Sequence, residues 1–152
     1  MQQTITKNHF GVYAIILKKD HIVLVKKIRG PYKDKLDLPG GRPEHGETIH
    51  ETLKREVMEE TGIDVYQTKL FNNYSTVAIA TTQAGIQEQI HHIGAIYLVL
   101  SFDYSALMND MDREDSLGAE WYLIAALTED QLSPFAYQAI IAMKHSKLAG
   151  IK

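Results

Sequence analysis

The chain contains no cysteine among its 152 residues. This absence excludes a disulfide framework, a cysteine nucleophile and a thiolate metal site, and it fits a reducing compartment. The N-terminus, MQQTITKNHF, lacks the charged start and apolar run of a signal peptide. The longest nearly apolar stretch, residues 93–100, is far shorter than the ~20 residues that span a bilayer. We therefore expect a soluble cytoplasmic protein without a membrane partner.

The chain also lacks an excess of positive charge. Its 16 Lys and Arg residues against 19 Asp and Glu residues leave a formal net charge of -3. A sequence-independent nucleic-acid binder normally carries a basic excess, so a nucleic-acid partner is not expected. A small anionic ligand remains compatible with this charge if a cation lies between ligand and protein. The length and the 45% hydrophobic content fit one globular domain over residues 1–152.

The residue pattern predicts an α/β or α+β fold with a mixed β-sheet in a sandwich with helices. We expect residues 11–17 and 21–28 to form a hairpin, followed by a loop over residues 29–35. The other expected elements are an extended piece at 36–38, strands within 65–82, 89–103 and 120–124, an acidic loop at 109–118, and helices at 49–61 and 135–148.

The expected helix over residues 49–61 has clear start and stop signals. Thr48 followed by Glu51 three residues later is a capping-box pattern. Gly62 stands where a glycine commonly ends a helix in the left-handed conformation. In the same way, Ser133 and Pro134 are a plausible N-cap and first residue for the C-terminal helix.

Glutamates lie on the side of this helix that should face the protein. At ~100° per residue, Glu56 and Glu60 fall close to the apolar stripe, and Glu59 flanks them. An ordinary solvated helix would place its glutamates opposite the stripe. Like charges at i,i+4 repel, and partial burial raises the cost, so positive charge is needed nearby. The apolar stripe consists of Ile49, Leu53 and Val57.

Two sources of positive charge remain open. A divalent cation is one, because oxygen-rich sites favour Mg²⁺ or Mn²⁺. The other is Arg55 together with nearby lysines, which would make the glutamates a simple charge cluster. The turn Pro39-Gly40-Gly41 lets the backbone pass close to a ligand, and a carbonyl there would be a further oxygen donor.

This segment resembles the Nudix box, G-x5-E-x7-R-E-U-x-E-E-x-G-U, in which U is a bulky aliphatic residue. Every defined position is filled at the right spacing, and the chain around it is similar to small MutT-like members. The resemblance implies the Nudix α/β/α sandwich and a metal-dependent hydrolase. The matching residues are Gly41, Glu47, Arg55, Glu56, Val57, Glu59, Glu60, Gly62 and Ile63.

The resemblance also implies roles. Glu59 and Glu60, with Glu56 near them and the Gly40 carbonyl, would be metal ligands. Arg55 would orient a catalytic glutamate through a charge-assisted hydrogen bond. Glu47 would join the outer metal shell or pair with Arg55, and we favour Glu56 as the base that takes a proton from water. The family also uses a carboxylate from a later loop, for which the candidates are Asp115 first, then Glu114 and Glu120.

Substrate contacts are expected from the loop after the second strand. Lys27 and Arg29 would contact phosphate, and Tyr32 would contact a base or sugar. The plain alternatives are an exposed basic rim and an ordinary loop aromatic. His91 and His92 must face opposite sides of a strand, and as metal ligands they are less favoured than as ordinary polar residues.

The substrate implied is a nucleoside diphosphate linked to another group, such as a nucleoside triphosphate or a nucleotide sugar. Two alternatives stay open: removal of pyrophosphate from an RNA 5′ end, and a Nudix-like sensor that binds a nucleotide without cleaving it. The intact set of box carboxylates favours hydrolysis over sensing. The expected partner is thus a small-molecule nucleotide, and homodimers, which are common among relatives, are a further possibility.

Overall fold

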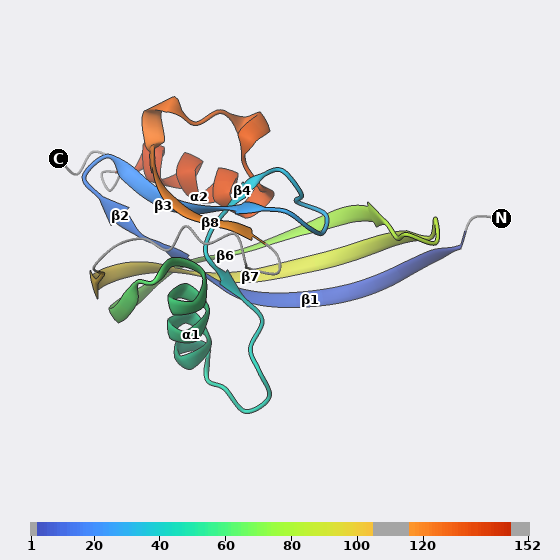
Figure 1. The fold of residues 1–152 in the computed structure, drawn as a ribbon, viewed down its shortest axis with the longest axis horizontal. Coiled ribbons are helices and arrows are strands. Elements are labelled where there is room, and N and C mark those ends of the chain that lie inside the picture. Colours follow the sequence, from blue (N-terminus) through green and yellow to red (C-terminus); the bar gives the residue numbers. More distant parts are fainter. Residues whose placement is uncertain (1–2, 105–115, 147–152) are drawn as a thin grey trace.

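The computed structural model describes residues 3–104 and 116–146, and the side chains at positions 116 and 117 are not described. It is a mixed α+β structure with two sheets and two α-helices, which confirms the predicted fold class (Figure 1). The strands are β1 (Thr4–Ile15), β2 (Leu17–Lys18), β3 (His21–Lys27), β4 (Leu36–Asp37), β5 (Gly40–Gly41), β6 (Asp64–Thr81), β7 (Gln87–Asp103) and β8 (Ser116–Leu123). The α-helices are α1 (Ile49–Thr61) and α2 (Pro134–His145), with 3-10 turns at Ile124–Ala126 and Glu129–Gln131.

The larger sheet has the order β5-β1-β7-β6, and it is mixed because β1 runs parallel to β7 while the other pairs are antiparallel. In the smaller sheet, β3 pairs with β2, β4 and β8. The predicted hairpin was therefore largely wrong. Only Leu17 and Lys18 of β2 pair with β3, next to one hydrogen bond from the Val23 N–H to the Ile16 carbonyl. Before that point both edges of β1 are occupied, one by β7 along Thr4–Ile15 and the other by β5 at Val12 and Tyr13.

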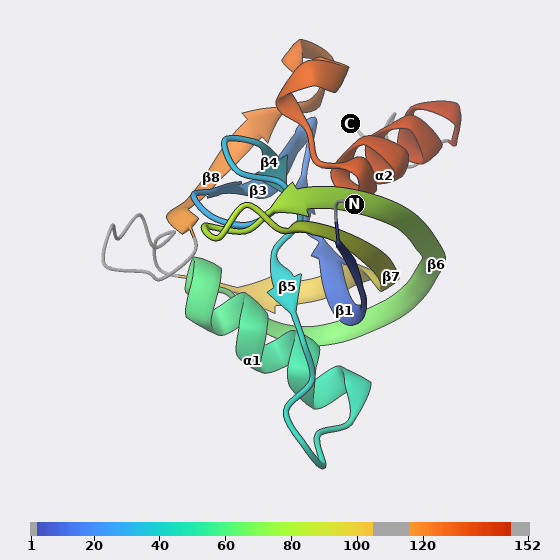
Figure 2. The ribbon, with the colours of Figure 1, turned by 90° about the vertical axis from the view of Figure 1, so that its right-hand side faces the viewer.

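Alternation along β1 sends its side chains into two cores on opposite faces of the larger sheet. Val12 and Ala14 pack in the core that α1 covers, and Tyr13 and Ile15 pack in the core that α2 covers. The helices thus lie on opposite sides of this sheet (Figure 2). This arrangement holds α1 in one orientation against β1 and β5.

Helix α1 has the predicted bounds. The Thr48 hydroxyl accepts a hydrogen bond from the Glu51 N–H at 3.1 Å, and Gly62, at φ 77°, donates its N–H to the Met58 carbonyl. Leu53 and Val57 are fully buried, as the stripe predicts, but Ile49 is 39% exposed. Ile49 is the first helical residue, and that end of α1 extends past the strands, so it finds no core to enter (Figure 1).

Helix α2 also begins as predicted, with Ser133 as N-cap and Pro134 as first residue. The Ser133 hydroxyl accepts from the Ala136 N–H at 3.3 Å and donates to the buried Asp37 carboxylate at 2.6 Å. This bond ties the helix to β4. In the described ranges, no helix has both the length and the apolar character needed to cross a membrane.

Candidate active site

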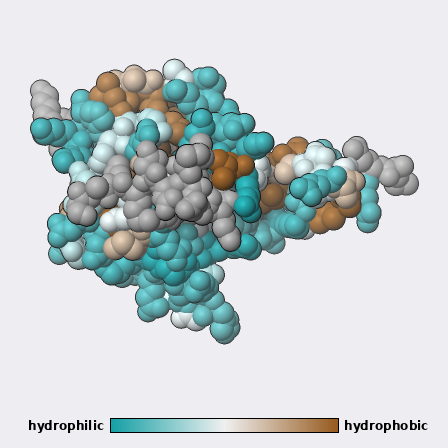
Figure 3. Space-filling model, viewed as in Figure 1, coloured by the Kyte–Doolittle hydropathy of each residue, from teal (hydrophilic) through white to brown (hydrophobic). Residues whose placement is uncertain are grey.

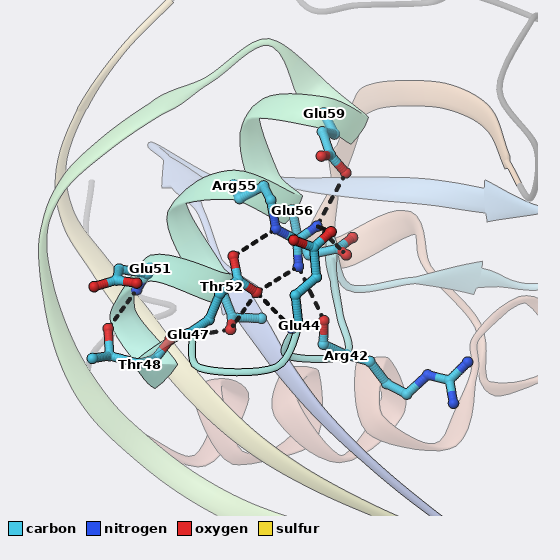
Figure 4. A network of polar contacts seen from close by, with 9 residues as sticks. All are labelled: Arg42, Glu44, Glu47, Thr48, Glu51, Thr52, Arg55, Glu56 and Glu59. Carbon is cyan, nitrogen blue, oxygen red and sulfur yellow. Dashed lines mark hydrogen bonds and ion pairs between the residues drawn. The ribbon is translucent and has the colours of Figure 1, made fainter.

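Arg55 is the centre of an ion-pair network on α1 (Figure 4). Its Nε and Nη2 donate to the two carboxylate oxygens of Glu47 at 2.7 and 2.8 Å. Its Nη1 donates to Oε1 of Glu56 at 2.8 Å and to Oε2 of Glu59 at 3.3 Å. The guanidinium group therefore links three box glutamates, and hydrogen bonding to Glu47 raises the Arg55 pKa further above its already high value. Arg55 stays charged at any physiological pH.

Glu47 connects the network to the loop before the helix. Hydrogen bonds from the Arg55 side chain and from the Glu44 N–H lower the Glu47 pKa to about 2. The Thr52 hydroxyl also donates to it at 3.2 Å, and Arg55 itself donates to the Arg42 carbonyl. Of the two roles implied for Glu47, pairing with Arg55 is therefore the one present in this geometry.

The glycine turn lies directly over two glutamates. The Gly40 N–H donates to Oε1 of Glu60 at 2.8 Å, and Glu60 is only 6% exposed. A Cβ on Gly41 would lie 2.5 Å from Cδ of Glu56, so only glycine allows this approach. Glu56 and Glu60 thus face the protein, as the helix geometry predicts.

A pocket of about 370 Å³ opens beside this turn. Its lining residues come from the end of β3, the loop that follows β3, the glycine turn, α1, and the paired strands β1 and β7. Among the predicted site residues, it is lined by Lys27, Arg29, Tyr32, Gly40, Gly41 and Glu56. Eight further lining residues were not predicted: His92, which the sequence analysis considered only as a less favoured metal ligand, and His9, Tyr13, Gly30, Pro31, Asp37, Arg42 and Ile90.

His92 joins two of the pocket tyrosines. Its Nε2 is 2.6 Å from the Tyr13 hydroxyl and its Nδ1 is 2.8 Å from the Tyr32 hydroxyl, and the Tyr32 ring stacks on the imidazole. Burial, and then the charges of His9 and Lys27, lower the His92 pKa to about 3, so the ring is neutral. Burial raises the pKa of both tyrosines, so they stay protonated. One tyrosine therefore donates to His92 and the other accepts from it.

The alternation of β7 predicts one histidine on each face but not which face is buried. His91 is exposed and His92 is buried. The partners of His92 are 79 and 60 residues away, and no local signal in the sequence indicates them.

The chain matches the family model described as the NUDIX domain over residues 7–143. It belongs to the Nudix family. An archaeal Nudix relative, the ADP-ribose pyrophosphatase of Methanocaldococcus jannaschii, is 42% identical over 66 residues, which is 43% of this chain and 39% of that protein. Nucleoside triphosphatase NudI of an Enterobacter species is 32% identical over 84 residues, 54% of this chain and 60% of that protein. The match thus spans less than two thirds of either relative.

Solved Nudix structures have the same fold. The MutT NUDIX hydrolase of Burkholderia pseudomallei superposes with a TM-score of 0.70 at 22% identity, covering 88% of this chain and 96% of that one. The NUDIX domain of Shewanella oneidensis NrtR, solved with ADP ribose, gives 0.69 at 17% identity, covering 91% and 87%. At such identities the likeness shows the fold alone.

The loop carboxylate of the Nudix site is only partly located. Asp115 and Glu114 lie outside the described residues. Glu120 is an exposed residue of β8, between Ala119 and Trp121, whose side chains pack on the α1 side. Alternation therefore turns Glu120 to the other face of β8, away from the box glutamates, which argues against it as the third carboxylate.

The metal donors expected of a Nudix box are present in kind. Carboxylate and carbonyl oxygens are the ligands that Mg²⁺ prefers. In the part of the chain that the structure describes, no three His, Asp or Glu side chains are already gathered around one point, so the box glutamates would have to turn toward a cation to bind it. Among the described residues, Arg55 supplies positive charge to the glutamates by pairing with Glu47, Glu56 and Glu59. Lys54 on the same helix pairs with Asp64 instead.

Proposed function

We propose that this chain hydrolyses a pyrophosphate linkage in a nucleoside diphosphate joined to another group, with Mg²⁺ or Mn²⁺ as cofactor. One observation carries the proposal: the box carboxylate of Glu56 lines the same pocket as the basic side chains of Lys27 and Arg29. An acidic side chain that can bind a metal ion thus lies next to basic side chains that can bind phosphate. The closeness of Gly41 to Glu56 keeps that carboxylate at the pocket wall.

The residues divide the chemistry between them. Glu56, Glu59, Glu60 and the Gly40 carbonyl would hold the divalent cation, which neutralises phosphate charge and lowers the pKa of a bound water. Glu56 accepts the proton of the attacking water. Arg55 orients the Glu56 carboxylate by donating a hydrogen bond to its Oε1. A carboxylate has two oxygens, so Arg55 and a cation can share one glutamate.

The nucleoside end of the substrate fits the tyrosine side of the pocket. Tyr32 and His92 form a stacked, uncharged pair beside Lys27 and Arg29, which suits a base or ribose attached to phosphates. The names of the relatives, an ADP-ribose pyrophosphatase and a nucleoside triphosphatase, support both proposed substrate types without selecting one. We propose a small nucleotide as the partner, in the cytoplasm, without nucleic acid.

A nucleotide panel with Mg²⁺ tests the proposal, with released phosphate read after a coupled pyrophosphatase or phosphatase. The panel includes nucleoside triphosphates and ADP-ribose. For the best substrate, Glu56→Gln and Glu59→Gln should each lower kcat by about 10²–10⁴-fold, as loss of a positioned proton acceptor or charge partner does. Both variants should remain folded, because a glutamine keeps the size of the side chain.

Glu51→Gln is the matched control, because Glu51 belongs to the same helix and is exposed. Its rate should stay within about twofold of the parent, as for a surface change away from the site. Chelation of the metal should abolish turnover. Parent-like rates in both Glu56→Gln and Glu59→Gln would remove the proposed site, and no turnover of any nucleotide would remove the activity.

A further inference from the structure

The pocket reaches onto the extension that β1, β6 and β7 form beyond the two cores (Figure 1). His9, Ile90 and His92 line it from β1 and β7. The surface of the extension mixes hydrophilic and hydrophobic side chains (Figure 3). His92, by contrast, is only 4% exposed. It therefore finds its hydrogen-bond partners inside the protein.

Two glycines leave room for the aromatic rings around His92. Gly11 and Gly94 are partners in the pairing of β1 with β7. A Cβ on Gly11 would lie 2.6 Å from ring atoms of Tyr13. A Cβ on Gly94 would lie 2.5 Å from the ring of Phe135, whose centroid is 4.3 Å from that of His92. The bare strand positions thus let both rings approach the imidazole.

The His92 ring has a tyrosine hydroxyl at each nitrogen. Nε2 lies 2.6 Å from the Tyr13 hydroxyl and Nδ1 lies 2.8 Å from the Tyr32 hydroxyl. Burial, which lowers the His92 pKa to about 3, keeps the ring neutral. A neutral imidazole has one N–H, which donates, and one unprotonated nitrogen, which accepts. Only two orders of the protons are therefore possible.

The two orders differ in the hydroxyl proton that is left over. In the first, Tyr13 donates to Nε2 of His92, and Nδ1–H donates to the Tyr32 oxygen. The proton of Tyr32 is then free to make another hydrogen bond. In the second, Tyr32 donates to Nδ1, and Nε2–H donates to the Tyr13 oxygen. The proton of Tyr13 then needs another acceptor.

Burial decides between the two orders. Tyr13 is 5% exposed, and in the part of the chain that the structure describes its hydroxyl has no hydrogen-bond partner besides His92. A buried donor without an acceptor is costly, which disfavours the second order. Tyr32 is less buried and lines the pocket, where water or a ligand can accept its proton. The distances agree, since hydroxyl donors make shorter bonds than N–H donors and the Tyr13 contact is the shorter.

We propose that the proton order runs from Tyr13 through His92 to Tyr32, and that Tyr32 donates its remaining proton to an acceptor atom on the nucleoside half of the ligand. The nature of the ligand rests on the proposed function, whereas the proton order rests on the contacts above. The phosphate half already has the donors of Lys27 and Arg29 in the same pocket. His92 is a positioning residue, because it acts through Tyr32. The pocket thus selects an acceptor at this point of the nucleoside.

Nitrogen NMR of the imidazole tests the proton order. In protein labelled with ¹⁵N at histidine, Nδ1 of His92 should carry the proton and Nε2 should be unprotonated. Loss of these signals in His92→Gln assigns them, and contacts of the ring protons with Phe135 and Tyr32 give the same assignment without a variant. The proton between Tyr13 and His92 should show no one-bond coupling to nitrogen. A proton on Nε2, or on both nitrogens, would overturn the proposal.

Two probes with a methylene bridge between their phosphorus atoms test the contact with the ligand. One is the diphosphate analogue of the nucleoside preferred in the panel, and the other is methylenebisphosphonate, which has no nucleoside. Tyr32→Phe should weaken binding of the first about 3–10-fold, as loss of one neutral hydrogen bond does. Binding of the second should stay within about twofold. With the best substrate, KM should rise more than kcat falls, because the box glutamates are untouched.

Tyr137→Phe is the matched control, because Tyr137 is a partly buried tyrosine of α2 that does not line the pocket. It should bind both probes like the parent. Unchanged binding of the nucleoside probe in Tyr32→Phe would overturn the contact, and an equal loss for methylenebisphosphonate would assign Tyr32 to phosphate and overturn it too. If no nucleotide binds or is hydrolysed, the proposed function fails and the Tyr32 contact fails with it. The NMR spectrum still decides the proton order in that case.

Discussion

Gly41 and Glu56 come closer than any other residue at position 41 would allow. A Cβ on Gly41 would lie 2.5 Å from Cδ and 2.6 Å from Oε2 of Glu56. The glycine turn and the helix carboxylate therefore depend on each other, although they are separated along the chain by the whole loop before α1. The relationship explains physically why a glycine opens the box.

Gly41→Ala should damage activity far more than stability. The atoms that the new methyl group would meet are the end of a flexible side chain, so Glu56 can rotate away at a cost of about 1 kcal/mol. That movement takes the carboxylate out of position, and kcat should fall by about tenfold or more. Steady-state kinetics and thermal unfolding measure the two effects. Gly85→Ala, in open space at the β6–β7 turn, should strain its turn and leave kcat unchanged; equal rates in both variants would contradict the prediction.

Arg55→Lys should not preserve the function of Arg55. The guanidinium group uses Nε, Nη1 and Nη2 on Glu47, Glu56 and Glu59, whereas an ammonium group is a single point that cannot reach all three. We expect kcat to fall by about 10–100-fold with KM little changed, because orientation of the carboxylates is lost rather than substrate contact. Lys54→Arg on the same helix is the control and should keep its pairing with Asp64. A parent-like kcat in Arg55→Lys would show that only the charge matters.

His92 should make the protein less stable as the pH falls below about 6.5. Burial lowers its pKa from the 6.5 of an ordinary imidazole to about 3 in the folded state. Between these values the unfolded chain binds a proton that the folded chain does not, so stability decreases toward acid. One such proton accounts for at most about 1.4 kcal/mol per pH unit. Denaturant unfolding over about pH 5–7.5 should show a steeper slope in the parent than in His92→Gln, which keeps the contribution of His9, whose pKa is also lowered by burial.

His91→Gln is the control for that comparison, because His91 is the exposed neighbour on the other face of β7. It should keep the parent slope. Equal slopes in the parent and His92→Gln would mean that His92 is protonated in the folded protein, and that its contacts with Tyr13 and Tyr32 are not those of a neutral ring.

Local chemistry was enough to predict α1 and its glutamates. Thr48 and Gly62 act within one turn of the helix ends, and the rotation per residue alone places Glu56 and Glu60 near Leu53 and Val57. The box was recognisable for the same reason, since its side chains sit on or beside a single helix. The prediction that Ile49 is buried was wrong, because burial depends on which other elements pack against the helix, and the helix sequence does not specify them.

The amino-acid sequence alone thus determined the carboxylate helix, the glycine turn before it and the membership of residues 41–63 in one motif. Only the tertiary structure decided that β1 pairs with β7, which places Tyr13 beside His92 and frees β1 from the predicted hairpin. It also decided that Tyr32 stacks on His92. Strand pairing joins residues far apart in the chain, and its register depends on the packing of the whole sheet rather than on any local pattern.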